Sequence, residues 1–164
     1  MKKLYIIRHA KSSWKDLYLD DFERPLNKRG KQNAPFMGDK LKDKNIVPDI
    51  IISSPALRAK TTAKIIAKKV KYNKKILFND NVYESSPIIL HKILIKIDDK
   101  NSIVFLFGHN PELNMLAEDY VKFDENIVTC GVVEIEFDCD KWTEISAENA
   151  KLISFDYPKK DRET

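Results

Sequence analysis

The stretch Leu4-Tyr5-Ile6-Ile7-Arg8-His9-Ala10 is a short apolar run that ends abruptly in an arginine and a histidine. Consecutive apolar β-formers without polar alternation are typical of a strand that is buried on both faces of a sheet. Such a strand delivers its last side chains to the edge of the sheet. The stretch therefore predicts a buried first strand with Arg8 and His9 as two reactive groups at its carboxyl end.

The composition is that of a globular protein. The chain has 164 residues, 43% apolar and 33% charged, which predicts one domain over 1–164 with a frayed tail over 158–164. The net charge of +4 comes from 29 basic and 25 acidic residues that are scattered along the chain, so nucleic acid is not an expected partner. No apolar segment is long enough to span a bilayer or to form a signal peptide. We therefore expect a cytoplasmic protein with no membrane partner.

The two cysteines and three histidines do not form a recognisable metal site. Cys130 and Cys139 lack C-x-x-C spacing, so we expect two free thiols that serve packing. His9, His91 and His109 are isolated from each other and from the cysteines, which disfavours zinc. We expect neither a metal nor a cofactor, and we interpret His91 as a surface or half-buried side chain.

Strand-like and helix-like segments alternate along the chain. We expect strands at 4–7, 49–53, 76–78, 102–107, 132–137 and 152–155, and helices at 27–44, 55–69, 88–97 and 111–120. Asn27, Ser54 and Ser86 are good N-caps, and proline follows the two serines. Pro35 predicts a kink or a restart in the first helix. The alternation predicts an α/β fold, a three-layer α/β/α sandwich with a mostly parallel sheet and the last two strands at an edge.

Three of the predicted elements bring cations or imidazoles toward the same edge of the sheet. Arg8 and His9 close the first strand, Arg58 lies in the first turn of the helix after the second strand, and His109 follows the strand at 102–107. Ligands of parallel α/β sheets bind outside the carboxyl ends of the strands. We therefore expect one cavity suited to a dianionic phosphoryl group. A nucleophilic imidazole in such a cage is sufficient for phosphoryl transfer without a metal.

The loop after the first strand offers further candidates. Lys11 and Ser12 follow His9 closely and are candidates to donate to phosphate oxygens, although a solvated loop over 11–21 explains them equally well. Arg24 either anchors this loop near the site or pairs with an acidic residue on the surface.

Four motifs resemble the histidine phosphatase superfamily. They are RHAKSSW at 8–14, DFERPLNKRG at 21–30, SSPALRAKTT at 53–62 and GHNPELN at 108–114. Their order and spacing are similar to those of the small bacterial SixA-like branch over about residues 3–155, which implies a phosphoglycerate-mutase-like fold. The resemblance implies that His9 is the nucleophile that becomes phosphorylated. It also implies that Arg8, Arg58 and His109 bind the phosphoryl oxygens and stabilise the transition state.

The proton donor follows less directly from the family pattern. Tyr83-Glu84-Ser85 resembles the segment in which members with large insertions place an acidic residue. Glu84 is therefore the candidate general acid, because a leaving alkoxide needs a proton whereas a leaving imidazole needs less help. A solvated loop glutamate is an equal alternative. Ala10 stands where many members have glycine. Alanine at this position is usual in the SixA-like branch.

These observations together predict a metal-independent phosphatase, a phosphoric monoester hydrolase that works in two steps. His9 attacks phosphorus in line, and water then hydrolyses the phosphohistidine. The compact chain has no long insertion to form a lid, which favours a phosphate presented on a protein, and the resemblance favours phosphohistidine. The absence of a lid disfavours a mutase, which must exclude water from its intermediate.

Two alternatives to this prediction stay open. A small phosphate ester is the other substrate class, in which case the chain is a small-molecule phosphomonoesterase. A non-catalytic phosphate-binding adaptor is the alternative from another class of protein, although a pure binder has no need for a nucleophilic histidine. The sequence leaves the oligomeric state open and is compatible with a monomer.

Overall fold

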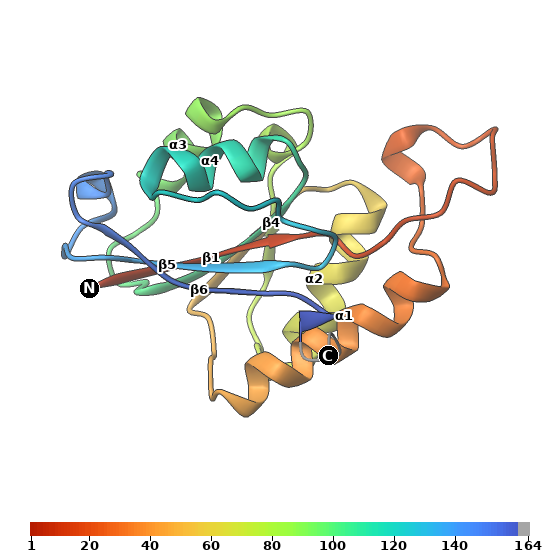
Figure 1. Cartoon of the computed structure of the whole chain (residues 1–164), viewed down its shortest axis with the longest axis horizontal. Coiled ribbons are helices and arrows are strands. Elements are labelled where there is room, and N and C mark those ends of the chain that lie inside the picture. Colours follow the sequence, from red (N-terminus) through yellow and green to blue (C-terminus); the bar gives the residue numbers. More distant parts are fainter. Residues whose placement is uncertain (161–164) are drawn as a thin grey trace.

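The computed structural model describes residues 1–160 as one sheet with helices on both faces (Figure 1). The strands are β1 (Lys2–Arg8), β2 (Ile50–Ser53), β3 (Ile76–Phe78), β4 (Ile103–Gly108), β5 (Val132–Phe137) and β6 (Ala150–Asp156). The helices are α1 (Lys28–Asp43), α2 (Leu57–Lys69), α3 (Pro87–Leu94) and α4 (Glu112–Tyr120), with short 3-10 turns at Asp21–Glu23, Asp80–Val82 and Trp142–Glu144.

The sheet has six strands in the order β3-β2-β4-β1-β5-β6. The pairs β3/β2, β2/β4 and β4/β1 are parallel, whereas β1/β5 and β5/β6 are antiparallel. The prediction of a three-layer α/β/α fold with a mostly parallel sheet is therefore confirmed. The expected edge position of 132–137 is wrong, because β5 pairs with β1 on one side and with β6 on the other.

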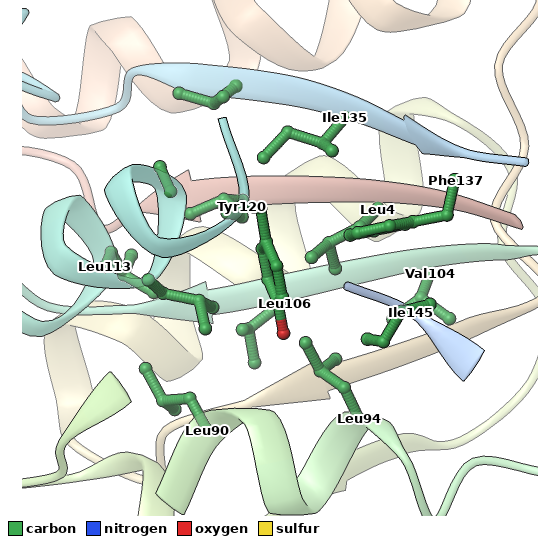
Figure 2. Close-up of a cluster of buried hydrophobic side chains, with 14 of the residues drawn as sticks. Leu4, Leu90, Leu94, Val104, Leu106, Leu113, Tyr120, Ile135, Phe137 and Ile145 are labelled. Carbon is green, nitrogen blue, oxygen red and sulfur yellow. The ribbon is translucent and has the colours of Figure 1, made fainter. Parts of the chain in front are cut away.

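β1 separates two apolar cores because its side chains alternate between the faces of the sheet. Leu4 and Ile6 point into one core, and Tyr5 and Ile7 point into the other, and all four are 3% exposed or less. The first core is completed from α3 and α4 and includes Leu90, Leu94, Leu106, Leu113, Tyr120 and Phe137 (Figure 2). The second is completed from α1 and α2 and includes Ala34, Met37, Leu41, Ala63, Ile66 and Phe107. The strand that carries Arg8 is thus held from both sides.

Of two caps expected at helix starts, one is confirmed and one is wrong. α1 runs without a restart through Pro35, and the cap at Asn27 is confirmed because its side chain accepts a hydrogen bond from Gly30 N at 2.9 Å. The predicted cap at Ser54 is wrong, since α2 starts later, with Ala56 at the N-cap position. The Ser54 hydroxyl instead contacts His109.

The structure also places the chain end and His91. Residues 158–160 form a turn in which Pro158 is buried, and Lys160 Nζ donates to Phe155 O at 2.7 Å, so the expected fraying is wrong as far as residue 160. The remainder of the predicted tail, 161–164, lies outside the described residues. His91 is half-buried, with Nδ1 2.7 Å from the Tyr120 hydroxyl.

Both cysteines are free thiols, with Cys130 buried and Cys139 partly buried. Within residues 1–160, no helix is long and apolar enough to cross a membrane.

Candidate active site

The register of β1 and β4 places two histidines side by side. Arg8 lies opposite Gly108 in this parallel pair, so His9 and His109 leave the sheet together at its carboxyl edge. The backbone N–H of His9 donates to Gly108 O at 3.1 Å, and the two imidazole rings are 5.1 Å apart between centroids. Each histidine is only 7–8% exposed. Strand pairing alone therefore brings together residues that are 100 positions apart in the sequence.

His9 is held as a neutral imidazole with one nitrogen free to react. Its Nδ1 lies 2.7 Å from the carbonyl oxygen of Ala10, which can only accept, so Nδ1 carries the proton and Nε2 keeps its lone pair. The pKa of His9 is lowered to about 3, chiefly by burial and in addition by the nearby His109, Arg58 and Arg8, while the bond to the Ala10 carbonyl opposes the shift. His9 is thus a neutral imidazole with an unprotonated Nε2 at neutral pH.

Thr62 locks the turn that follows His9. The Ala10 N–H donates to the Thr62 hydroxyl oxygen at 3.0 Å, and that hydroxyl donates to Arg58 O at 2.7 Å. Thr62 is one of the two threonines in the motif at 53–62, and it joins the end of β1 to the first turn of α2. The contact couples the position of His9 to the helix that carries Arg58.

His109 presents an N–H donor toward the site. Its Nε2 lies 2.8 Å from the Ser54 hydroxyl oxygen, which itself accepts from Ala56 N at 3.2 Å. All three groups are satisfied when the Ser54 hydroxyl donates to Nε2, and we assign the proton of His109 to Nδ1 on this basis. Burial and the Arg58 charge lower the pKa of His109 to about 4, so the ring is neutral.

The two arginines are partly committed to protein partners. Arg8 Nη1 donates to Ile127 O at 2.9 Å. Arg58 is 7% exposed, and it donates through Nη1 to Asp21 O at 2.6 Å and through Nη2 to Asp21 Oδ2 at 3.0 Å. Burial and Arg58 lower the pKa of Arg8, but a guanidinium stays protonated in proteins. Both side chains therefore keep their charge and several donors.

Two of the three orphaned polar atoms of the described residues lie at this site. Within 1–160, three buried side-chain nitrogen or oxygen atoms lack a hydrogen-bond partner, namely Arg8 Nε, His109 Nδ1 and Ser85 Oγ. Two of them belong to the cage of Arg8, His9, Arg58 and His109, and Ser85 lies two residues after Tyr83, which contacts His109. Buried polar groups are rarely left unpaired. Because Arg8 Nε and the assigned His109 Nδ1 are N–H donors, the cage matches an anionic group.

Sequence reasoning missed Asp21 and Tyr83 as parts of this site. The Tyr83 hydroxyl donates to Asp21 Oδ2 at 2.7 Å, and the Tyr83 ring meets His109 edge to face at 5.6 Å between centroids. Phe22 packs on the other side of Tyr83 at 5.2 Å. Both residues lie in stretches that the sequence singled out, since Asp21 opens the motif at 21–30 and Tyr83 stands beside Glu84. Their contacts arise between separate loops, which periodicity does not reveal.

The remaining candidates occupy more peripheral places. Glu84 is exposed and has a positive φ of 50°, and its neighbour Tyr83 is the residue that contacts His109. The Lys11 side chain is exposed, while the Lys11 carbonyl accepts from Asn27 N at 2.9 Å. A Cβ at Gly30 would lie 2.2 Å from that carbonyl oxygen, so only glycine allows this approach.

Ser12 and Arg24 hold the loop itself. The Ser12 hydroxyl accepts from Arg24 Nη2, and Arg24 also donates to Ser13 O at 3.1 Å and to Asp21 Oδ1 at 3.0 Å. The guanidinium carbon lies 3.2 Å from the ring centroid of Trp14. Arg24 therefore both anchors the loop and pairs with an acidic residue, two roles that the sequence left as alternatives.

None of the described residues forms a group of three histidine, cysteine, aspartate or glutamate side chains that could hold a metal ion. The cage is made from arginine and histidine nitrogens, which suit an anion rather than a cation. It combines a neutral imidazole with an unshared electron pair, two guanidinium groups and an imidazole N–H. This set can bind a phosphoryl group and attack it.

Comparisons with known proteins identify the family and the fold. The family model described as the histidine phosphatase superfamily (branch 1) matches residues 4–85, half of the chain. A solved structure of a candidate phosphohistidine phosphatase SixA from Agrobacterium tumefaciens is 26% identical, with a TM-score of 0.81 over 96% of this chain and 98% of that one. The protein histidine phosphatase SixA complexed with tungstate shares the fold at 16% identity, with a TM-score of 0.81 over 95% and 97% of the two chains.

Curated relatives include proteins of different length. A chloroplastic protein of Arabidopsis thaliana is 27% identical over 155 residues, which cover 89% of this chain and 71% of the relative. Phosphoglycerate mutase 1 of Saccharomyces cerevisiae is 37% identical over 71 residues, which cover 42% of this chain and only 29% of the yeast enzyme. The chain thus matches less than a third of the mutase's length.

Proposed function

Since this chain belongs to the histidine phosphatase superfamily (branch 1), we propose that it is a metal-independent phosphatase in which His9 carries the phosphoryl group during turnover. The observation that carries the proposal is the pair of orphaned donors, Arg8 Nε and His109 Nδ1, in the cage around a neutral His9. These donors supply what an anionic phosphoryl group requires, and His9 Nε2 supplies the nucleophile.

In the first step, the Nε2 lone pair of His9 forms a bond to phosphorus while the bond to the leaving group breaks in line. The leaving atom keeps the bonding electrons. An alkoxide takes its proton from Glu84, whereas an imidazole nitrogen takes it from solvent. Arg8, Arg58 and the Nδ1–H of His109 bind the equatorial oxygens, where negative charge is spread in the transition state. The Ala10 carbonyl stabilises the positive charge that develops on the His9 ring through its bond to Nδ1–H.

In the second step, water attacks phosphorus on the face opposite His9. The N–P bond breaks, its electrons return to Nε2, and inorganic phosphate leaves with the oxygen of the water. The same three donors hold the oxygens in both steps, so no rearrangement of the cage is needed.

The proton-donating groups around the cage favour a substrate with an undemanding leaving group. Asp21, with a pKa of about 2, and Tyr83, with a pKa of about 12, are both poorly matched to general acid catalysis at neutral pH. Glu84 is exposed and stays the candidate acid for ester substrates. An imidazole leaving group needs less protonation than an alkoxide, which supports phosphohistidine on a protein as the substrate. The phosphohistidine phosphatase named in the A. tumefaciens structure supports the same choice.

Trapping of the intermediate tests this proposal. Wild-type protein is mixed with a histidine-phosphorylated protein or with p-nitrophenyl phosphate and quenched within one turnover. We expect a phosphoryl label that is acid-labile and alkali-stable in the wild type and absent in His9→Ala. We also expect a higher kcat/KM for the phosphoprotein than for the ester.

The two open alternatives correspond to distinct results of this experiment. Labelling and turnover with the ester but not with the phosphoprotein would indicate a small-molecule phosphomonoesterase. Phosphate binding without label or turnover would indicate an adaptor. We further propose a cytoplasmic location and a single domain over 1–164.

A further inference from the structure

Asp21 connects three side chains that surround the site. Its Oδ2 accepts from Arg58 Nη2 at 3.0 Å and from the Tyr83 hydroxyl at 2.7 Å, and its Oδ1 accepts from Arg24 Nη1 at 3.0 Å. Its backbone oxygen accepts from Arg58 Nη1 at 2.6 Å. Asp21 therefore ties its loop to α2 and to the segment after β3 at a single point.

Only a carboxylate fits this position. The three side-chain donors face two different oxygens, so both carboxylate oxygens must accept. An asparagine has one accepting oxygen, and its NH₂ group would face either Arg24 or the pair of Arg58 and Tyr83. Partial burial opposes ionisation of Asp21, but the bonds from Tyr83, Arg24 and Arg58 outweigh it and lower the pKa to about 2.

The contact orients Arg58 relative to the phosphoryl site. A guanidinium group has five N–H bonds in one plane, and Arg58 gives two of them to Asp21, one to its backbone oxygen and one to Oδ2. These two bonds hold the plane of the fork, and the other three N–H bonds remain for phosphoryl oxygens. The bond to Tyr83 holds the aromatic ring against His109 in the same way.

We propose that Asp21 is a positioning residue that fixes the Arg58 fork and the Tyr83 ring in the geometry required for phosphoryl transfer. The inference rests on the phosphatase function proposed above and adds a role for the motif at 21–30. A competing interpretation is that the Asp21 carboxylate merely repels the phosphoryl group from Arg58. The two differ in sign, because a positioning residue supports turnover and a repelling charge opposes it.

Kinetics with p-nitrophenyl phosphate separate the two interpretations. We expect Asp21→Asn to lower kcat by about tenfold or more, because the arginine fork loses its fixed plane, while KM changes by less than about threefold. Asp21→Glu keeps two accepting oxygens and should lose less than Asp21→Asn. The adjacent, exposed Asp20 makes a matched control, and Asp20→Asn should leave both constants unchanged. An unchanged or higher kcat in Asp21→Asn, or an Asp21→Asn enzyme as active as Asp21→Glu, would overturn the inference.

A second measurement requires no turnover. In wild type, hindered rotation of the Arg58 guanidinium should give separate Nη–H signals in nitrogen-15 NMR spectra, and these signals should average in Asp21→Asn but not in Asp20→Asn. Retained separate signals in Asp21→Asn would overturn the positioning role whether or not the wild type is active. Absence of a phosphohistidine label in the wild type would instead contradict the proposed function. Circular dichroism melts of all variants control for folding.

Discussion

The site is built from two regions of different construction, the strand ends that carry most of the cage and the loops that surround it. Arg8, His9 and His109 stand at the ends of β1 and β4, adjacent strands whose apolar side chains are almost all fully buried. Asp21 and Tyr83 come from loops that are partly exposed, and the Asp21 side chain is 48% accessible. Core packing fixes the positions of the side chains in the first region, whereas polar contacts between side chains fix them in the second. We call Arg8, His9 and His109 the strand-borne region, and Asp21 and Tyr83 the loop-borne region. Conservative substitutions should therefore abolish most activity in the strand-borne region and reduce activity by graded amounts in the loop-borne region.

The largest effect is expected in the strand-borne region. Arg8→Lys keeps the positive charge but removes the planar fork and the buried Nε–H, so kcat/KM should fall by about 10³. Steady-state kinetics with p-nitrophenyl phosphate measure this, and Arg29→Lys, the same change at an exposed arginine of α1 outside the cage, serves as the control. A fall of less than about tenfold in Arg8→Lys would show that charge alone suffices in this region.

The two regions should also respond differently to acid. His9 and His109 have folded-state pKa values of about 3 and 4, below the ordinary value of 6.5, so the unfolded chain takes up protons that the folded chain refuses. The free energy of unfolding should thus fall as pH drops below about 6.5, by up to about 2 kcal/mol per histidine between pH 7 and pH 5. Asp21, whose pKa is lowered to about 2, keeps its charge over this range.

Urea denaturation at several pH values measures the slope of the free energy of unfolding against pH. His9→Gln and His109→Gln should each flatten it, while His91→Gln, outside the cage, should leave the contribution of the two cage histidines in place. A slope that is the same in wild type and in both cage variants would contradict the buried neutral state of these rings.

Ser54 tests how the strand-borne region depends on a neighbour. Ser54→Ala removes the hydroxyl that fixes the His109 proton on Nδ1, so kcat should fall by about tenfold. Ser53→Ala is the matched control, because Ser53 is equally buried but its hydroxyl donates to Ser54 O and not to His109. Equal activity of the two variants would refute the assigned proton position.

The smallest effect is expected in the loop-borne region. Tyr83→Phe keeps the ring on His109 and removes only the hydroxyl bond to Asp21, so kcat should fall by about threefold. Tyr83→Ala removes the ring as well and should lose more. Kinetics of the two variants side by side provide the measurement, and a larger loss in Tyr83→Phe than in Arg8→Lys would invert the comparison.

The same division explains what could be predicted from the sequence. The apolar runs before Arg8 and before His109 predict strands that end at one edge of a mostly parallel sheet, whereas the pairing of β1 with β4 and its register come from the structure alone. Asp21 and Tyr83 were missed as site residues because their partners are determined by how two loops meet. Ser54 was mistaken for a helix cap because Ser-Pro is a good helix start locally, whereas His109, 55 residues away, takes its hydroxyl. Local chemistry is readable from the sequence, but competition from a distant partner is not.

The loop after β1 is attached at both ends, by the backbone of Lys11 against Gly30 and by the carboxylate of Asp21 against Arg58. The segment 15–19, which excludes the Arg24 contacts of Ser13 and Trp14, extends beyond the sheet in Figure 1, with Leu17 87% and Tyr18 100% exposed. Its length and side chains can therefore be exchanged without moving either attachment. A library of loops grafted at 15–19 could re-target the phosphatase toward a chosen phosphoprotein while the chemistry at His9 stays the same.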